Sequence, residues 1–417
     1  MNKRVVVTGM GIISPVGNNV AEFWKNILDG VCGIDFITAF PTDDLPAKVA
    51  GEVKNFVPAE HGVEQAFARK QDKFSVFAVA AANEAMKQCG LSTAEEGGNI
   101  DASRFGVYVG SGIGGFSTQY KESEKMIQDG AKWISPLFIP TMIANMAAGN
   151  IAIKHNLCGP CVPVVTACAT STHTIGEAYR AIKHGYADAI IAGGAEAATI
   201  PLGIAGFANA KALSKSEDPK YASLPFNANR GGFVMGEGAA MLVLEEYEHA
   251  KARGANIIAE MCGYGNTCDA YHMTAPRTDC KTQAEAVRLA LEEAGYTADD
   301  VLHINAHGTG TSLNDSLETK TFKMVLGDDA YKAHICSTKS MTGHMLGATG
   351  AVEAIASILA LVNGVVPPTI NLDTPDPECD LNYTPGKAVK ADLTLAISDS
   401  LGFGGHNGCI AFRKFSE

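Results

Sequence analysis

Cys168 stands where the residue pattern would let a thiol act as a nucleophile. It follows an apolar, strand-like run, Val162–Val165, and precedes a helical pattern that extends from Ala169 to His184. The large apolar residues of that pattern recur at the spacing of one helix face: Ile175, Tyr179 and Ile182. A cysteine at such a junction lies at the positive end of the helix dipole, which favours the thiolate. The sequence therefore predicts a nucleophilic thiolate at Cys168, with a buried, inert thiol as the alternative.

The other cysteines suggest no competing chemistry. Cys158 and Cys161 form a single C-x-x-C pair without a second pair or a nearby histidine to complete a zinc site. The rest show no metal-ligand spacing, so no metal site is predicted at the cysteines. The odd total of 11 cysteines, in a chain that enters a strand at once and leaves no room for a signal peptide, predicts reduced thiols and a cytoplasmic location.

Two of the 11 histidines lie in segments where a thiol could find a proton-handling partner. His307 follows a predicted strand in Asn305-Ala306-His307-Gly308-Thr309-Gly310-Thr311. His344 lies in Ser337-Thr338-Lys339-Ser340-Met341-Thr342-Gly343-His344, with Lys339 five residues upstream. A structural role suits any single histidine, but loops of Gly and Thr at strand ends are where α/β proteins place function. The sequence predicts that both histidines belong to the site.

Strand-like and helical runs alternate along the chain, which is typical of an α/β fold. The predicted strands are Arg4–Thr8, Gly106–Val109, Val162–Val165, Asp188–Ala192, Met241–Leu244, Ile257–Cys262, Leu302–Asn305, His334–Ser337, Leu393–Ser398 and Cys409–Phe412. The clearest predicted helices are Lys73–Cys89, Ala169–His184, Lys281–Ala294 and Gly350–Val362.

A weak internal repeat divides the chain. Val5–Gly11 and Ala259–Gly265 both read as a strand that ends in Gly-x-Gly, and similar elements follow each of them in the same order. We expect two similar halves, residues 1–253 with Cys168 and residues 254–417 with both histidines and Lys339, joined near Glu248–Ala255. Equivalent loops of the two halves can face each other, which predicts an active site at their junction.

Composition excludes several functions. The chain of 417 residues is 46% hydrophobic and has a net charge of −12, which argues against nucleic-acid binding. No apolar run approaches the roughly 20 residues that cross a bilayer, so no membrane span is predicted.

Two further motifs have other interpretations. Gly110-x-Gly112-x-x-Gly115 fits the dinucleotide fingerprint by letter, but the acidic residue at the required distance, Asp129, lies on no predicted strand, which disfavours nucleotide binding. Asp315 and Glu318 could form a metal-binding or general-base pair.

Four segments, in this order, resemble the β-ketoacyl-[acyl-carrier-protein] synthases of the thiolase superfamily over essentially the whole chain. They are Thr166-Ala167-Cys168-Ala169, Asn305–Thr311, Ser337–His344 and Gly402-Phe403-Gly404-Gly405. Asn407 also fits, whereas His406 replaces the threonine usual in the family. The resemblance implies a thiolase-like duplicated fold, five-layered αβαβα, in a homodimer.

The same resemblance implies the chemistry. Cys168 would accept an acyl group from acyl carrier protein, and the N–H groups of Cys168 and Phe403 would form the oxyanion hole. His307 and His344 would stabilise the enolate formed when malonyl-carrier protein loses CO₂, with Lys339 orienting His344, and Phe403 would act as a gate. A histidine at 344, rather than the asparagine of chain-starting synthases, indicates the elongating class. Glu318 would belong to a buried network behind the site, beside a structural monovalent cation.

Substrate and partner positions follow in the same way. Ile113, Phe138 and Phe207 match residues of the acyl pocket, and Ile113 indicates the type II subtype, which handles longer chains. Thr309 and Thr311 would bind the pantetheine arm, which arrives on the carrier protein, so no separate cofactor is expected. The local basic group Arg69, Lys70, Lys73 and Lys211 is the candidate docking patch for that acidic partner. A polyketide ketosynthase and a non-catalytic chain-length-factor-like subunit are the alternatives, and the latter would lack the nucleophile.

Overall fold

The computed structural model describes residues 3–94 and 97–416. Its central feature is a nine-stranded sheet with the order β4-β5-β6-β1-β7-β13-β12-β8-β9. The first half supplies β1 (Val5–Ile13), β4 (Phe105–Gly110), β5 (Ala189–Glu196) and β6 (Gly238–Glu246). The second half supplies β7 (Ala259–Cys268), β8 (Leu302–Asn305), β9 (His334–Cys336), β12 (Leu395–Gly402) and β13 (His406–Arg413).

The two halves of the sheet repeat one arrangement. In the first, β4 pairs in parallel with β5, and β5, β6 and β1 follow in antiparallel order. In the second, β8 pairs in parallel with β12, and β12, β13 and β7 follow in antiparallel order. Only a short antiparallel pairing of β1 with β7 joins them, at Val5–Val7 and Ala259–Met261. The topology therefore has the internal duplication expected from the sequence.

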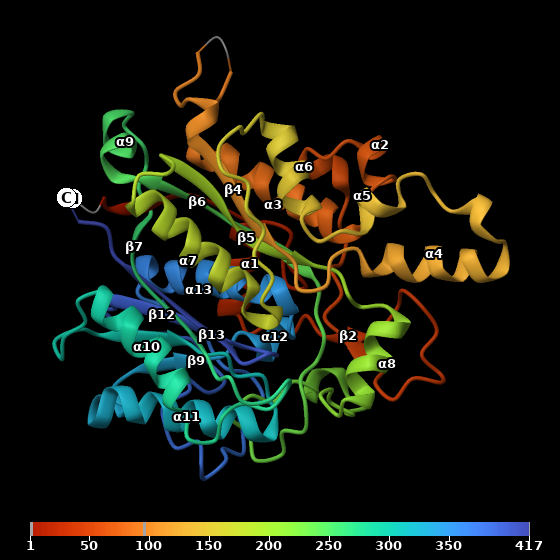
Figure 1. The fold of residues 1–417 in the computed structure, drawn as a ribbon. Coiled ribbons are helices and arrows are strands. Elements are labelled where there is room, and N and C mark those ends of the chain that lie inside the picture. Colours follow the sequence, from red (N-terminus) through yellow and green to blue (C-terminus); the bar gives the residue numbers. More distant parts are fainter. Residues whose placement is uncertain (1–2, 95–96, 417) are drawn as a thin grey trace.

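Helices complete five layers (Figure 1). One face of the first half-sheet is covered by α3 (Lys73–Cys89) and α6 (Met146–His155), and one face of the second by α10 (Lys281–Glu293) and α11 (Ser312–Leu326). Between the half-sheets lie α7 (Thr170–Lys183) and α13 (Thr349–Asn363), which pack on strands of both. A helix in such a layer is apolar on most sides, as the buried residues of α13 show. The predicted thiolase-like αβαβα fold is confirmed.

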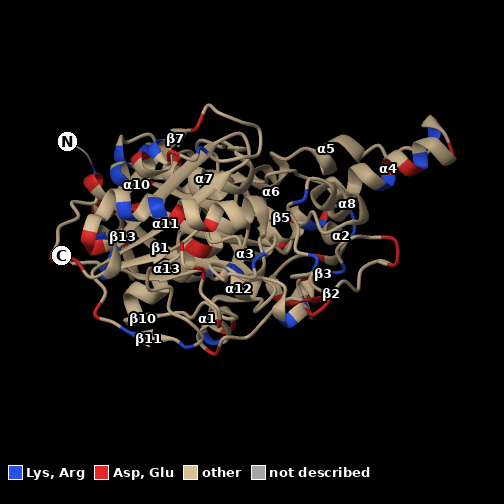
Figure 2. Cartoon of the chain, turned by 90° about the horizontal axis from the view of Figure 1, so that it is seen from below, with Lys and Arg blue, Asp and Glu red and all other residues tan. Residues whose placement is uncertain are grey.

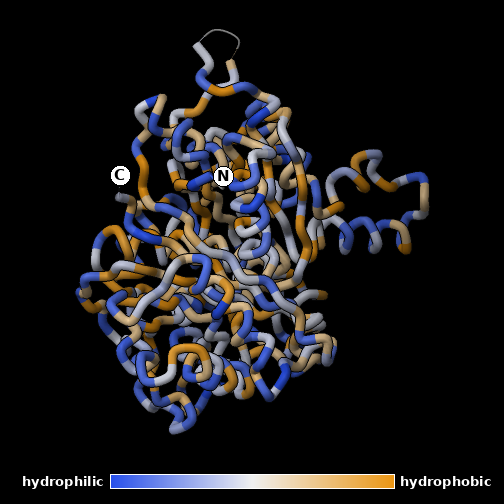
Figure 3. Tube along the Cα trace, turned by 60° about the vertical axis from the view of Figure 1, so that its left-hand side comes forward, coloured by the Kyte–Doolittle hydropathy of each residue, from blue (hydrophilic) through white to orange (hydrophobic). Residues whose placement is uncertain are grey.

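The remaining elements lie outside these layers or at their edges. The helices are α1 (Val20–Leu28), α2 (Gln65–Ala68), α4 (Phe116–Gln128), α5 (Phe138–Met142), α8 (Pro201–Asn209), α9 (Tyr247–Ala252) and α12 (Lys339–Thr342). Two small sheets pair β2 (Asp35–Phe36) with β3 (Val49–Ala50) and β10 (Val365–Val366) with β11 (Val389–Lys390). An arm containing α4 projects from the body and carries acidic, basic and hydrophobic residues together (Figures 2 and 3).

One predicted strand is wrong. Val162–Val165 is reduced to a single parallel bridge of Cys161 with Val107 on the outer side of β4. Pro160 and Pro163 flank this bridge and have no N–H to donate, so the ladder cannot continue. In the second half the equivalent position beside β8 is occupied by β9, which does pair as a strand.

Among the residues that the structure describes, one helical segment has the length and hydropathy of a membrane span, Leu346–Asn363, although the sequence predicted none. Of that segment 83% is buried inside the protein. It coincides with α13 and the turn before it, in the central helix layer, so its apolar character is explained by packing between the two half-sheets.

Candidate active site

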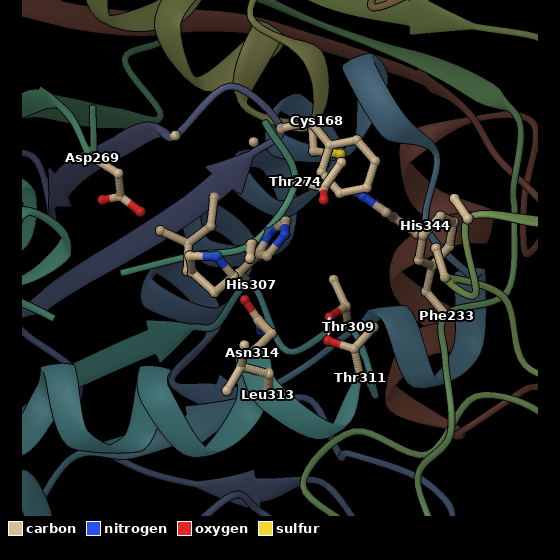
Figure 4. A pocket seen from close by; sticks show the side chains of 18 of the residues that line it. Cys168, Phe233, Asp269, Thr274, His307, Thr309, Thr311, Leu313, Asn314 and His344 are labelled. Carbon is tan, nitrogen blue, oxygen red and sulfur yellow. Dashed lines mark hydrogen bonds between the residues drawn. The ribbon is translucent and has the colours of Figure 1, made fainter. Parts of the chain in front are cut away.

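A pocket of about 230 Å³ opens where the two halves meet (Figure 4). Cys168 enters it from the first half, and His307, His344 and Phe403 from the second. Its other lining residues are Ala210, Lys211, Ala212, Phe233, Asp269, Thr274, Ala275, Pro276, Thr309, Thr311, Leu313, Asn314, Leu401, Gly402, Gly405 and Asn407. The predicted meeting of Cys168 with the two histidines at the junction of the halves is therefore present.

Cys168 lies in a one-turn 3₁₀ helix, Ala167–Ala169, directly before α7. Ala167 has φ 52°, a left-handed conformation that costs a non-glycine residue on the order of 1 kcal/mol or more. The same turn recurs in the second half, where Leu346 (φ 46°) begins the 3₁₀ turn Leu346–Ala348 before α13. The two turns contact each other, and the nucleophile position of one corresponds to Gly347 in the other.

The environment of Cys168 corrects the expectation of a resting thiolate. Burial raises the pKa of this thiol to about 12, although the charge of Lys339 and the N–H groups of Phe403 and Cys168 itself lower it. Loss of solvation therefore outweighs the charge of Lys339 and the two N–H groups, because a buried thiolate gives up most of its hydration. The thiol must lose its proton to a base as it reacts.

This protonation state predicts a pH dependence. Because the folded pKa lies near 12, the thiolate fraction of Cys168 grows roughly tenfold per pH unit throughout the mildly alkaline range. The rate of alkylation by iodoacetamide, followed by mass spectrometry of the peptide containing Cys168, should still be rising between about pH 8 and pH 10. A plateau reached near pH 7 would show that the thiolate already predominates at neutrality.

His307 and His344 form a perpendicular pair, with ring centroids 5.4 Å apart and planes at 89°. Burial, reinforced by the charge of Lys339, lowers the pKa of both imidazoles well below the usual value. Both rings are therefore neutral at neutral pH, so each can donate one N–H and accept one proton. The Nδ1 of His344 lies 3.0 Å from the hydroxyl of Thr349. If that hydroxyl donates, the ring carries its proton on Nε2.

Lys339 is placed differently from the expectation that it orients His344. Its Nζ lies 2.5 Å from the carboxylate of Glu353 on α13, and both side chains are buried. The hydrogen-bond partner of His344 is instead Thr349. Lys339 does not line the pocket, so it acts on the thiol and the two imidazoles through its charge.

The loop that carries His307 is fixed by two buried acids. Glu318 accepts hydrogen bonds from the N–H groups of His307 (2.5 Å) and Gly308 (2.8 Å), and Asp315 accepts from those of Phe226 and Gly310. Burial raises the pKa of both carboxyl groups. Glu318 thus belongs to a polar network behind the site. Within the described residues, no group of three or more His, Cys, Asp or Glu side chains is arranged to hold a metal ion.

Phe403 lies in the tight turn between β12 and β13, where Gly404 (φ 88°) and Gly405 (φ 77°) adopt conformations that favour glycine. Its ring is 6.3 Å from that of Phe207, so Phe207 backs the turn although it does not line the pocket. The turn is also bonded to the segment after β7, since Gly404 donates to the carbonyl of Met273 (2.7 Å).

The predicted binding residues divide into two groups. Thr309 and Thr311 line the pocket with hydroxyls 3.0 Å apart, and Lys211 lies at its wall. Ile113 and Phe138 are not among the lining residues and are partly exposed. Of the other predicted docking residues, Arg69 and Lys70 are exposed, whereas Lys73 is held 2.5 Å from the carboxylate of Glu237.

The glycine-rich segment 110–115 already has an anionic partner within the protein. Glu196, at the end of β5, accepts from the Ser111 hydroxyl (2.7 Å) and from the N–H groups of Gly112 (2.8 Å) and Gly347 (3.0 Å). Asp129 caps the C-terminus of α4 instead of ending a strand. The fingerprint glycines thus bind a buried carboxylate that ties this segment to the turn before α13.

Sequence reasoning missed several residues that shape the pocket. Phe233 packs edge-on against His344 with centroids 5.1 Å apart. Asp269 accepts hydrogen bonds from the side chains of Asn407 and Gln283 and holds the segment after β7. No short motif marked them, because each comes from a loop distant in sequence from Cys168. His406, the departure from the family pattern, begins β13 and faces the ring of His173 at 6.3 Å.

Comparison with known proteins gives a consistent result. Residues 2–250 match the family described as Beta-ketoacyl synthase, N-terminal domain, and residues 258–373 match Beta-ketoacyl synthase, C-terminal domain. The chain is 47% identical over 414 residues to 3-oxoacyl-[acyl-carrier-protein] synthase 2 of Staphylococcus aureus (strain COL), covering 99% of both chains. It is also 47% identical to the protein of that name from Synechocystis sp., covering 99% of this chain and 98% of the relative.

Solved structures agree in fold over nearly the full length. A ketosynthase complex with a type II polyketide acyl-carrier protein has a TM-score of 0.91 at 34% identity and covers 100% of both chains. A β-ketoacyl synthase from Burkholderia phymatum STM815 has a TM-score of 0.91 at 35% identity and covers 99% of this chain and 100% of its own. With Cys168 facing two neutral histidines inside this fold, the chain belongs to the β-ketoacyl synthase family.

Proposed function

We propose that this enzyme is an elongating condensing enzyme of the 3-oxoacyl-[acyl-carrier-protein] synthase 2 type. It joins an acyl group held as a thioester on Cys168 to the two-carbon unit of malonyl-[acyl-carrier-protein], with loss of CO₂, in fatty-acid synthesis. One observation carries this proposal. A single pocket contains a buried thiol, two backbone N–H groups that bond its sulfur, and two neutral imidazoles.

In the first half-reaction the sulfur of Cys168 attacks the carbonyl carbon of the incoming acyl thioester. The thiol proton passes to a neutral imidazole of the pocket, and the N–H groups of Cys168 and Phe403 stabilise the oxyanion. The carbon–sulfur bond to the carrier's pantetheine then breaks. The leaving thiolate takes up the proton, which restores the neutral imidazole and leaves an acyl-enzyme.

In the second half-reaction the bond from malonyl C2 to its carboxylate breaks, and CO₂ leaves. The electron pair passes to the thioester carbonyl as an enolate, which the N–H groups of His307 and His344 stabilise. Each such donor in a dry site contributes about 3–4 kcal/mol. The enolate carbon attacks the acyl-enzyme, and the carbon–sulfur bond to Cys168 breaks to release a 3-oxoacyl thioester two carbons longer. The thiolate that leaves on Cys168 takes up a proton from solvent, which restores the resting thiol.

We propose further that Thr309 and Thr311 hold the pantetheine arm, and that no metal or organic cofactor takes part. The steps above are accounted for by side chains, backbone N–H groups and the phosphopantetheine of the carrier protein. The 11 unpaired cysteines suit a reducing cytoplasm.

Fatty-acid elongation is favoured over the polyketide alternative. The relatives that are 47% identical carry the name 3-oxoacyl-[acyl-carrier-protein] synthase 2, whereas the polyketide ketosynthase is 34% identical. The presence of Cys168 disfavours a non-catalytic chain-length-factor-like subunit. The direct test is to incubate the enzyme with acyl donors of graded length and malonyl-[acyl-carrier-protein]. Release of one CO₂ per 3-oxoacyl product is expected, and absence of a longer product with every acyl donor would contradict the proposal.

We propose that the enzyme is a homodimer. A set of large apolar side chains from one stretch of sequence is exposed on the single chain: Ile113, Met126, Ile127, Trp133, Leu137, Ile139, Ile153, Val162, Val165 and Leu202. Exposed apolar side chains are typical of an interface where they form a contiguous patch. A second copy that covers α4 and α5 would bring Ile113 and Phe138 out of solvent, as their role in an acyl pocket requires. Sedimentation at micromolar concentration should give twice the 43.7 kDa of one chain.

The predicted docking patch leads to a prediction about how tightly carrier-bound substrates bind. Because the enzyme itself is acidic, an acidic carrier protein must be attracted locally. Reversing Arg69, Lys70 and Lys211 to glutamate should raise KM for carrier-bound substrates about tenfold or more at low salt, while turnover of small pantetheine thioesters changes little. Lys73 is left unchanged because it is paired with Glu237.

The matched control is Lys390→Glu, an exposed lysine on β11. It should leave KM for both substrate types unaltered. An equal loss with carrier-bound and small substrates in the triple variant would place the docking patch elsewhere.

Phe403 gives a prediction about the order of the two half-reactions. A bulky ring between glycines can move with its turn, and the backbone N–H of Phe403 bonds the sulfur of Cys168 in the pocket that both residues line. Phe403→Ala should uncouple decarboxylation from condensation, so that CO₂ is released from malonyl-[acyl-carrier-protein] before an acyl group is present. The ratio of CO₂ to 3-oxoacyl product measures this. A ratio that stays at one, as we expect for the exposed control Phe36→Ala, would mean that Phe403 serves only packing.

A further inference from the structure

The turn that carries Cys168 is anchored mainly through Thr166. The Thr166 N–H donates to the hydroxyl of Thr170 (2.9 Å), and its carbonyl accepts from the N–H of Ala169 (3.1 Å). Its hydroxyl lies 2.7 Å from Nδ1 of His173, one turn into α7. Because Ala167 is held in a left-handed conformation, these bonds maintain a turn that the chain would not adopt unaided.

The protonation of His173 follows from its partners. Its Nε2 lies 3.3 Å from the carbonyl oxygen of Asn407, which can only accept, so Nε2 carries the hydrogen. The ring is buried, and burial lowers its pKa to about 4, so the imidazole is neutral at pH 7. Nδ1 is therefore an acceptor, and the hydroxyl of Thr166 donates to it.

His173 thus connects the two parts of the structure that supply the oxyanion hole. Thr166 belongs to the turn with the N–H of Cys168, while Asn407 belongs to the β12–β13 hairpin, whose turn supplies the N–H of Phe403. A second link runs beside the first, from the Thr172 hydroxyl to that of Ser400 (2.7 Å).

The hairpin is shaped for this ring. Gly408 follows Asn407, and a Cβ at that position would lie only 2.9 Å from Nε2 of His173. Any larger residue would have to displace the imidazole. The imidazole of His173 therefore fits closely against β13, both at the Asn407 carbonyl and at Gly408.

We propose that His173 is a positioning residue that sets the separation of the two oxyanion-hole donors by joining Thr166 to Asn407. This proposal rests on the proposed function, because it concerns the acyl transfer to Cys168. His173 does not line the pocket, so it acts on the reaction only through the two backbone segments that it connects.

This role separates two reactions of the same sulfur. Acyl transfer develops negative charge on a carbonyl oxygen and needs both N–H groups in place. Alkylation by iodoacetamide displaces iodide and develops no such charge on a bound carbonyl. A residue that fixes the oxyanion hole should therefore affect the first reaction far more than the second.

The test measures both rates in four single variants and one double variant. His173→Phe and Thr166→Val each remove the hydrogen bond from one side and should slow acylation by acyl-[acyl-carrier-protein] about 30- to 100-fold, with alkylation changed less than about threefold. Thr166→Ser and His173→Gln keep a donor or an acceptor and should recover most of the rate. The double variant Thr166→Val/His173→Phe should be no slower than the slower single variant, as expected for two ends of one contact.

The control is His184→Phe, at the exposed C-terminal cap of the same helix, which should match the unaltered enzyme in both rates. Equal loss of acylation and alkylation, or additive effects in the double variant, would overturn the proposal. So would unchanged acylation in Thr166→Val, a smaller change that tests the contact even if His173→Phe does not fold. A failure of the proposed function is distinguishable, because the unaltered enzyme would then form no 3-oxoacyl product.

Discussion

Replacing Cys168 by alanine is expected to abolish acyl-enzyme formation and to reduce condensation by about 10⁴-fold or more. No other side chain in the pocket is a comparable nucleophile, and the two N–H groups that would hold the oxyanion are directed at this position. Mass spectrometry after incubation with an acyl thioester should find the added mass on the peptide containing Cys168 in the unaltered enzyme and nowhere in the variant.

The fold should survive this change, because alanine fits the space of the thiol and the turn is held by Thr166 and Thr170. The matched control is Cys161→Ala, an exposed cysteine seven residues upstream, which should acylate normally at Cys168. An acyl adduct on Cys161, or full activity in Cys168→Ala, would contradict the assignment of the nucleophile.

Removing either histidine should block condensation while sparing part of the first half-reaction. His307→Ala and His344→Ala each remove one donor to the enolate, which should lower the condensation rate about 10²- to 10³-fold. Each single variant keeps one neutral imidazole that can accept the thiol proton, so Cys168 should still be acylated. The double variant loses both imidazoles, and since burial keeps the thiol protonated, its acylation should fall as well. Single-turnover acylation and steady-state CO₂ release separate the two effects.

His184→Ala, an exposed histidine at the end of α7, serves as the control and should leave both half-reactions unchanged. If one single variant lost acylation as completely as Cys168→Ala, that histidine would be the sole base for the thiol. Its proposed role in stabilising the enolate would then be secondary.

Local sequence patterns were sufficient to predict most helices and strands and the types of the reactive residues. Helix α3 has the bounds predicted for Lys73–Cys89, since Asp72 and Gly90 cap it and its apolar spacing is regular. The internal repeat predicted a duplicated fold, and the four motifs predicted that Cys168, His307 and His344 share a site. Because such signals are local or repeated, they can be recognised without knowledge of tertiary contacts. The predicted strand Val162–Val165 failed because its apolar residues were counted while the two prolines that interrupt hydrogen bonding were not.

The properties that depend on burial and on distant partners were decided only by the tertiary structure. The sequence placed Cys168 at a helix terminus and so predicted a thiolate, but the amount of water removed from the sulfur is set by all the segments that enclose it. Lys339 was expected to orient His344, whereas folding pairs it with Glu353 and leaves that role to Thr349. In the sequence, His173 is one residue of a helical pattern. Only the folded structure shows that its ring contacts Asn407 of the β12–β13 hairpin. Sequence determined which groups this protein has, and the packing of its two halves determined their protonation, their partners and their separation.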